Sequence, residues 1–175
     1  EAVAPLGKDY QDVIRRAINE NWIDVYETPG KESGAFSAGV YGVHPFVKLN
    51  YSDGLDDAFT LAHELGHAMH SYLSSATQDY ANHDYRLLVA EVASTCNEVL
   101  LTKYLLKTET DTKRRAYILN HFLEGFRSAR PCSLNLSIRR THSKLPELPS
   151  TQSALTKSMP SLLSSTIPTQ NSATR

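Results

Sequence analysis

The sequence comprises 175 residues with 18 basic and 19 acidic side chains, a net charge of −1 and two cysteines, which is enough chain for one hydrophobic core. The balanced charge, without a run of five like charges, argues against a nucleic-acid partner, and the scarcity of cysteine argues against a disulfide framework and for a reducing compartment. Because no stretch of about 18 apolar residues could cross a bilayer and the amino terminus lacks the order of a secretory signal, we expect a soluble, cytoplasmic protein without a membrane partner.

The segment before residue 52 is predicted to form one helix and one β-hairpin. Apolar residues recur at helical spacing over residues 9–23, which predicts the helix. Gly42 and His44-Pro45 separate the runs 35–41 and 46–51, which are rich in Val, Phe and Tyr. This pattern predicts a hairpin whose proline lies at the turn or at a sheet edge.

A second helix is predicted to start at Ser52-Asp53-Gly54, and it contains the string His63-Glu64-Leu65-Gly66-His67. Residues four apart lie one turn above each other on a helix, so both imidazoles can reach a single ion, with Zn–N distances of about 2.0–2.1 Å. Glu64 projects from the adjacent flank. A carboxylate in that place can accept a proton from water that zinc acidifies.

Chance is the alternative explanation of this motif, because a short pattern with three fixed residues also arises in unrelated helices. The helix signals around it and its apolar neighbours favour metal binding. Gly66 points the same way, since glycine inside a helix costs about 1 kcal/mol relative to alanine and therefore predicts a packing or access requirement.

Two further helices are predicted, over residues 85–106 and 111–126. Asp84 is expected to cap the first of them. The residues expected to face the core from this helix are Leu88, Val92, Cys96, Val99 and Leu100.

Glu91 is the candidate third ligand. It lies in the apolar run 87–93, where an unpaired buried carboxylate would be costly and a metal would remove that cost. The alternative is that the helix turns Glu91 to solvent. Three polar residues that follow on nearby faces could orient the ligands through hydrogen bonds, namely Ser94, Thr95 and Glu98.

The donor set indicates the metal. Two imidazoles and one carboxylate suit zinc, a borderline-soft ion with an open catalytic position, better than calcium or magnesium. We expect one zinc ion per chain. The expected fold is mainly α, with a small β-hairpin beside a two-helix zinc site.

Three strings in the sequence, ESGAFSAGVYGVHPFVKLNY, DDAFTLAHELGHAMHSY and LLVAEVASTCNEVLL, resemble oligoendopeptidase F, a branch of the thimet-oligopeptidase-like zinc peptidases. The resemblance extends from about residue 4 to residue 127. It implies a mainly helical, zincin-like metallopeptidase core that encloses its site in a deep channel and cleaves short peptides.

The resemblance also assigns residues. It implies His63, His67 and Glu91 as zinc ligands and Glu64 as the catalytic base. The hairpin would line the cleft and could pair with an extended peptide. His70 matches the family string too, and we interpret it as a polar histidine on the helix surface. Substrate-binding residues are not identified.

The end of the sequence departs from the family. All 15 aromatic residues lie before residue 128, whereas residues 128–175 hold eleven serines and five of the eight prolines. We therefore expect a partial catalytic domain over residues 1–127. Residues 128–175 are interpreted as an out-of-frame tail, because a shifted reading frame can encode family-like segments there; a disordered Ser/Pro-rich tail is the alternative.

Two functions remain open at this point. In the first, the chain is part of a zinc metalloendopeptidase that hydrolyses short oligopeptides. In the second, it binds zinc or peptide without turnover, because family members are several times longer and the groups that position substrate and stabilise charge cannot be placed in this sequence.

Overall fold

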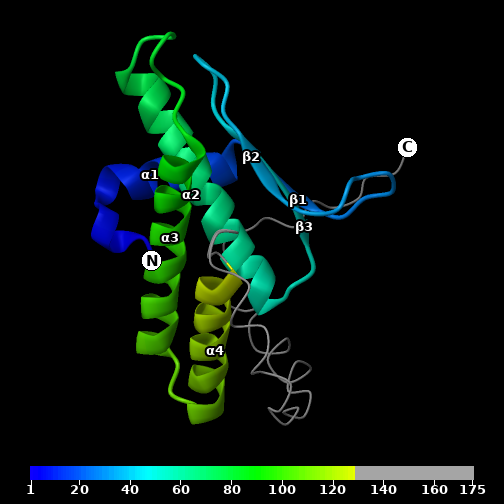
Figure 1. Cartoon of the computed structure of the whole chain (residues 1–175). Coiled ribbons are helices and arrows are strands. Elements are labelled where there is room, and N and C mark those ends of the chain that lie inside the picture. The colour runs from blue at the N-terminus through cyan, green and yellow to red at the C-terminus, as the bar shows by residue number, and fades with distance from the viewer. Residues whose placement is uncertain (129–175) are drawn as a thin grey trace, which may run out of the picture.

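The structure is a computed structural model that describes residues 1–128 (Figure 1). The tail expected from residue 128 onward lies outside the described residues, apart from Ser128 itself. The described part is mainly helical, as predicted. Its elements are a short 3-10 helix (Ala4–Leu6), α1 (Lys8–Asn19), β1 (Ile23–Tyr26), β2 (Phe36–Ala38), β3 (Phe46–Tyr51), α2 (Leu55–Thr77), α3 (Leu87–Thr108) and α4 (Thr112–Ser128).

Helix α2 is the centre of this arrangement. The sheet packs on one side of it and α3 runs along another side (Figure 1). The contact with the sheet is apolar and is formed by Val47, Leu49 and Ala68. A second apolar cluster, of Leu55, Phe59 and Ile118, holds α4 against the beginning of α2.

The sheet has the strand order β1-β3-β2. The predicted hairpin is confirmed: β2 pairs antiparallel with β3, with Ser37 opposite Val47. Strand β1, which pairs parallel with β3 through Ile23 and Val47, was not predicted. The predicted first helix ran through Ile23, but α1 ends at Asn19 and the chain reverses at Asn21, whose φ is 58°. Strand β1 is short and its parallel partner lies far along the sequence, so no local pattern predicts it.

The start of α2 is fixed by one carboxylate. Asp57 Oδ2 accepts hydrogen bonds from Gly54 N (2.9 Å), Ser52 N (3.0 Å) and Ser52 Oγ (2.8 Å). Gly54 is the N-cap of α2, so these bonds satisfy the amide of the capping residue and tie the turn before the helix to its first turn. The predicted helix start at residues 52–54 is therefore confirmed.

Two predictions about α3 were wrong. The helix begins after Arg86, and Asp84 accepts only from the adjacent Tyr85 amide, so it is no helix cap. The expected core face was also misplaced, since Leu88 is 80% exposed and Cys96 is exposed. The residues of α3 that are buried are Ala90, Ser94, Asn97 and Thr102. At Ser94 the two helices approach most closely, since a Cβ atom on Gly66 of α2 would lie 2.5 Å from Ser94 Cα.

A buried amide joins three helices. Asn97 Nδ2 donates to the Ala62 carbonyl of α2 (3.1 Å), and Asn97 Oδ1 accepts from the Tyr10 hydroxyl of α1 (3.0 Å). Asn97 is 2% exposed. These bonds fix the positions of α1, α2 and α3 relative to one another, next to the helix turns that carry His63 and His67.

Candidate metal centre

The two histidines of the motif lie on successive turns of α2 and face one point. Their rings are nearly perpendicular, at 84°, with centroids 4.7 Å apart. The Nε2 atoms of His63 and His67 are 3.0 Å from each other. This is the arrangement expected of residues four apart on a helix whose imidazoles bind the same ion.

Glu91 brings a carboxylate from α3 to the same point. Its Oε2 lies 3.6 Å from His63 Nε2, and one donor atom from each of His63, His67 and Glu91 lies within 4.8 Å of the other two. A tetrahedral ion with bonds of about 2.0–2.2 Å holds its ligand atoms roughly 3.3–3.6 Å apart. The His63–Glu91 distance already lies at this value, the Nε2–Nε2 distance of 3.0 Å would widen slightly, and any longer separation, at most 4.8 Å, would shorten; with these shifts the three groups would fit a zinc ion and leave a further position open.

The sequence argument for Glu91 was only partly correct. The apolar run does not bury it, because its side chain is 46% exposed and its neighbour Val92 faces outward. The alternative, that α3 turns Glu91 to solvent, is likewise only partly correct, because about half of the side chain is covered. Glu91 lies at the margin of the helix contact, where its carboxylate reaches the histidines.

Gly66 explains how the two helices come so close. A Cβ atom on this residue would lie 2.5 Å from Ser94 Cα, 2.8 Å from Ala93 O and 2.9 Å from Ser94 N. All three are backbone atoms of α3, so no flexible side chain could yield. The packing requirement predicted for Gly66 is therefore present, and it determines how near Glu91 approaches α2.

Two polar contacts orient the candidate ligands. The Nδ1 atom of His63 bonds with Glu98 Oε1, which turns the opposite nitrogen toward Glu91. Ser94 Oγ bonds with Glu91 Oε2 at 3.2 Å and with the Glu91 carbonyl at 3.1 Å. Such partners fix the tautomer and orientation of metal ligands. Thr95, the third residue suggested for this role, is exposed.

Glu64 is almost completely buried beside this group, with 8% of its surface exposed. Burial raises the pKa of Glu64, the negative charge of Glu91 raises it further, and His63 opposes the change. A raised pKa makes a carboxylate a better proton acceptor at neutral pH.

The same surroundings shift the pKa values of the two histidines in opposite directions. The bond to Glu98 is the main cause that raises the pKa of His63, whereas burial is the main cause that lowers the pKa of His67. A neutral His67 presents a lone pair for a metal, which is the form that zinc requires.

His70, interpreted from the sequence as a polar histidine of the helix surface, is partly buried on α2. Its ring stacks on Tyr85, with centroids 3.7 Å apart and an angle of 13°. Its Nδ1 atom is buried without a hydrogen-bond partner among the described residues, and burial lowers its pKa. His70 lies outside the group of three donor atoms.

Tyr85 is a residue of the site region that sequence reasoning missed. Its hydroxyl donates to the His67 carbonyl at 3.4 Å and lies 2.6 Å from Ser71 Oγ. It thereby ties the segment before α3 to α2. Nothing in the sequence around Tyr85 indicates this role. By contrast, the polar residues at positions 91, 94 and 98 lie at helical spacing, and this stripe indicates the face of α3 that is turned toward the ligands.

None of the helices in residues 1–128 combines the length and apolar character that a bilayer crossing requires.

Comparison with known families gives one match that covers most of the chain. The model of Peptidase family M3 matches residues 6–143. Among curated proteins, Oligopeptidase PepF of Bacillus subtilis (strain 168) is 47% identical over 127 residues, which are 73% of this chain and 19% of PepF. An Oligoendopeptidase F homolog of Lactococcus lactis subsp. lactis (strain IL1403) is also 47% identical over 127 residues, 21% of its own length. The chain thus spans about one fifth of these relatives.

Solved structures agree with this comparison. A crystal structure from Chlamydophila abortus superposes with a TM-score of 0.69 and 40% sequence identity, over 73% of this chain and 22% of that chain. A second, from Bacillus anthracis, has a TM-score of 0.50 at 16% identity and supports the fold alone.

Proposed function

The chain belongs to peptidase family M3, and on that premise we propose that it carries the zinc-binding core of a metalloendopeptidase that hydrolyses short oligopeptides. The observation that supports this most directly is the convergence of His63, His67 and Glu91 within 4.8 Å beside the buried Glu64. The names of the curated relatives, which include oligopeptidases and oligoendopeptidases, favour short peptides as substrates.

In this proposal one zinc ion per chain is held by His63, His67 and Glu91. When bound, zinc acidifies water and polarises a peptide carbonyl. The residues of the chain perform the remaining tasks. Glu98 keeps His63 in the tautomer that directs Nε2 toward Glu91, and Ser94 restrains the Glu91 carboxylate.

Glu64 is assigned the proton transfers. Its carboxylate accepts a proton from the attacking water and passes it to the amine nitrogen that leaves when the peptide bond breaks. The raised pKa of Glu64 suits both halves of this cycle, because the group must first take up and then release a proton near neutral pH.

Strand β2 is the element that we propose to align the substrate. It pairs with β3 on one side and lies at an edge of the described sheet. A free strand edge can bind an extended peptide through backbone hydrogen bonds. β2 also contacts α2, so a peptide along this edge would pass near the candidate ligands.

A second candidate function is zinc or peptide binding without turnover. It is favoured by the short span of the chain, about one fifth of the relatives. Residues that stabilise charge in the transition state can lie elsewhere in such proteins, and the loss of one hydrogen-bond donor of this kind costs about 10²–10³ in rate.

Two measurements test these proposals. Elemental analysis after metal-free purification and zinc titration should give one zinc per folded chain, and occupancy near zero would contradict the metal site. Cleavage of short fluorogenic peptides by the zinc-loaded chain separates the two functions. Glu64→Gln should keep the zinc and abolish cleavage, whereas retained cleavage in this variant would refute the assignment of Glu64 as the base.

A further inference from the structure

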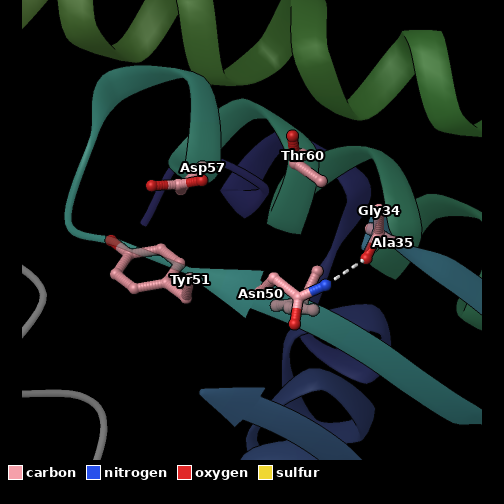
Figure 2. Close-up of a pocket in the computed structure, with 7 residues that line it drawn as sticks. Gly34, Ala35, Asn50, Tyr51, Asp57 and Thr60 are labelled. Carbon is pink, nitrogen blue, oxygen red and sulfur yellow. Dashed lines mark hydrogen bonds between the residues drawn. The ribbon is translucent and has the colours of Figure 1, made fainter. Parts of the chain in front are cut away.

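The beginning of the edge strand β2 lies beside the first turns of α2. Asn50 of β3 donates through Nδ2 to the carbonyl of Gly34 at 2.9 Å, just before the strand (Figure 2). The next residue, Ala35, lines a small pocket together with Thr60 of α2. Ala35 also packs on the apolar cluster between the sheet and the helix. These contacts place the start of the strand near Thr60, one helix turn before Glu64.

The end of β2 is in close contact with a later turn of α2. A Cβ atom on Gly39, the residue after the strand, would lie 2.7 Å from Ser71 Cβ and 2.8 Å from Ser71 Oγ. Gly39 does not have a positive φ, so its backbone would accept alanine and only this contact requires glycine. Thr60 and Ser71 are about 16 Å apart along the helix axis, and residues 35–39 span about 13 Å. The strand therefore runs along α2 past the turn that carries His63 and His67.

Ser71 is held in place by Tyr85. The Oγ atom of Ser71 lies 2.6 Å from the Tyr85 hydroxyl. A helical serine often bonds the carbonyl four residues before it, but here Tyr85 donates to that carbonyl, of His67, at 3.4 Å. The Tyr85 ring is stacked on His70, with centroids 3.7 Å apart, and this stack fixes the position of the hydroxyl. Tyr85 thus ties the residue that β2 touches to the backbone of a candidate ligand.

We propose that Gly39, Ser71 and Tyr85 form a spacer that sets the distance between strand β2 and the candidate metal centre. They are positioning residues, which act through the strand and not on the peptide itself. A methyl group at residue 39 would push the strand end away by about 0.7 Å, the difference between 2.7 Å and ordinary contact at 3.4 Å. A peptide paired with β2 would move with the strand, while the zinc ligands on α2 and α3 would stay in place. This inference rests on the proposed function, because it takes β2 as the strand that aligns the substrate.

The first test compares peptide affinity with zinc affinity in the full 175-residue chain. Every chain carries Glu64→Gln and zinc, and a fluorescein-labelled heptapeptide without proline is the probe. Gly39→Ala should weaken peptide binding about tenfold, because the backbone hydrogen bonds along β2 lengthen, and should leave zinc affinity unchanged. Gly125→Ala is the control, since its Cβ meets no atom within 4 Å, and should change neither affinity. Unchanged peptide affinity in Gly39→Ala, or no peptide binding by the parent chain, would overturn the proposal.

A compensating substitution separates a spacer from a general loss of stability. Ser71→Gly removes both atoms that the new methyl group of Gly39→Ala would meet, so the double variant moves a methyl-sized group from the helix to the strand. Its peptide affinity should return to within about threefold of the parent chain, although Ser71→Gly alone weakens binding. If the two substitutions only destabilise the fold, their effects add and the double variant binds most weakly. That additive result would refute the spacer.

Tyr85→Phe keeps the test informative if Gly39→Ala does not fold. Phenylalanine retains the stack on His70 and lacks the hydroxyl that holds Ser71. Peptide affinity should fall about threefold, as expected for the loss of one neutral hydrogen bond. Tyr80→Phe is the matched control, because Tyr80 lies in the same connection between α2 and α3, is 73% exposed and keeps its ring contact with His83. Equal peptide affinities of these two variants would contradict the role of Tyr85.

Cleavage assays separate this inference from the proposed function. In chains that retain Glu64 and cleave a fluorogenic peptide, Gly39→Ala should raise KM about tenfold with kcat nearly unchanged, because pairing along β2 is the same in the ground state and the transition state. An unchanged KM in this variant would overturn the spacer and leave the proposed turnover intact. Peptide affinities that follow the spacer variants in a chain that cleaves nothing would support the spacer and contradict only the turnover.

Discussion

Replacing Gly66 by alanine tests whether the close contact of α2 with α3 creates the candidate metal centre. The new Cβ would lie 2.5 Å from Ser94 Cα, and ordinary contact begins at 3.4 Å. The helices must therefore separate by about 0.9 Å, since backbone atoms cannot rotate away. Glu91 lies three residues before Ser94 on the same rigid helix and would move out with it.

The expected effects on stability and on metal affinity differ in size. Overpacking costs about 1–3 kcal/mol, whereas alanine gains about 1 kcal/mol over glycine in a helix, so the metal-free chain should lose at most about 2 kcal/mol. Metal sites tolerate only about 0.2 Å in ligand distance, and we expect the zinc affinity to fall at least about tenfold.

The assay has two parts and one control. Urea unfolding in the presence of a chelator gives the free energy of unfolding, and competition with a zinc-binding dye gives the affinity. Gly125→Ala in α4 is the control, because its Cβ meets no atom within 4 Å. It should raise stability slightly and leave zinc affinity unchanged. Wild-type zinc affinity in Gly66→Ala would refute the argument that this contact positions Glu91.

Three further predictions follow from other contacts. Glu98→Ala should lower zinc affinity about 10–100-fold, whereas Thr95→Ala, at an exposed position of the same helix, should not; equal affinities in dye competition would contradict the orienting role. Tyr10→Phe leaves the buried Asn97 Oδ1 without its donor and should cost about 1–3 kcal/mol in urea unfolding, and a loss near zero would show that the bond does not contribute. The pKa of Tyr51 is raised to about 12 in the folded chain. The neutral Tyr51 side chain therefore contributes fully to the free energy of unfolding below the unfolded pKa near 10, and this contribution is lost as the pH rises toward 12. Between pH 10 and 12 the wild type should thus lose about 2 kcal/mol more than Tyr51→Phe, and parallel losses would contradict the burial argument.

The parts of the fold that could be predicted are those with a local signature. The His63–His67 pair follows from spacing on one helix, and the start of α2 follows from the turn and carboxylates around Asp57. The buried face of α3 was predicted wrongly from its apolar residues, because they surround this helix and their periodicity does not select a side, whereas the stripe of polar residues at positions 91, 94 and 98 does mark the face toward the ligands. Strand β1 was missed because its parallel pairing depends on residues far along the chain.

The candidate site also combines features that local sequence patterns predict with features that depend on the packing of distant segments. Sequence spacing brings the two histidines together, but only the packing of α3 on α2 decides that Glu91 reaches them and that Glu98 bonds with His63. The burial argument for Glu91 failed, although the residue does lie at the site. Asn97 and Tyr85 act through contacts between distant segments, which no local pattern records.

The antiparallel pairing of α2 with α3 has a consequence for folding kinetics. Residues 78–86 join the two helices, so the hairpin that they form closes a short loop and can assemble early. All three candidate ligands lie on this hairpin, and none comes from the sheet or from α1. Zinc could thus bind a half-formed chain and favour the transition state for folding, in which case it should accelerate refolding and not merely slow unfolding.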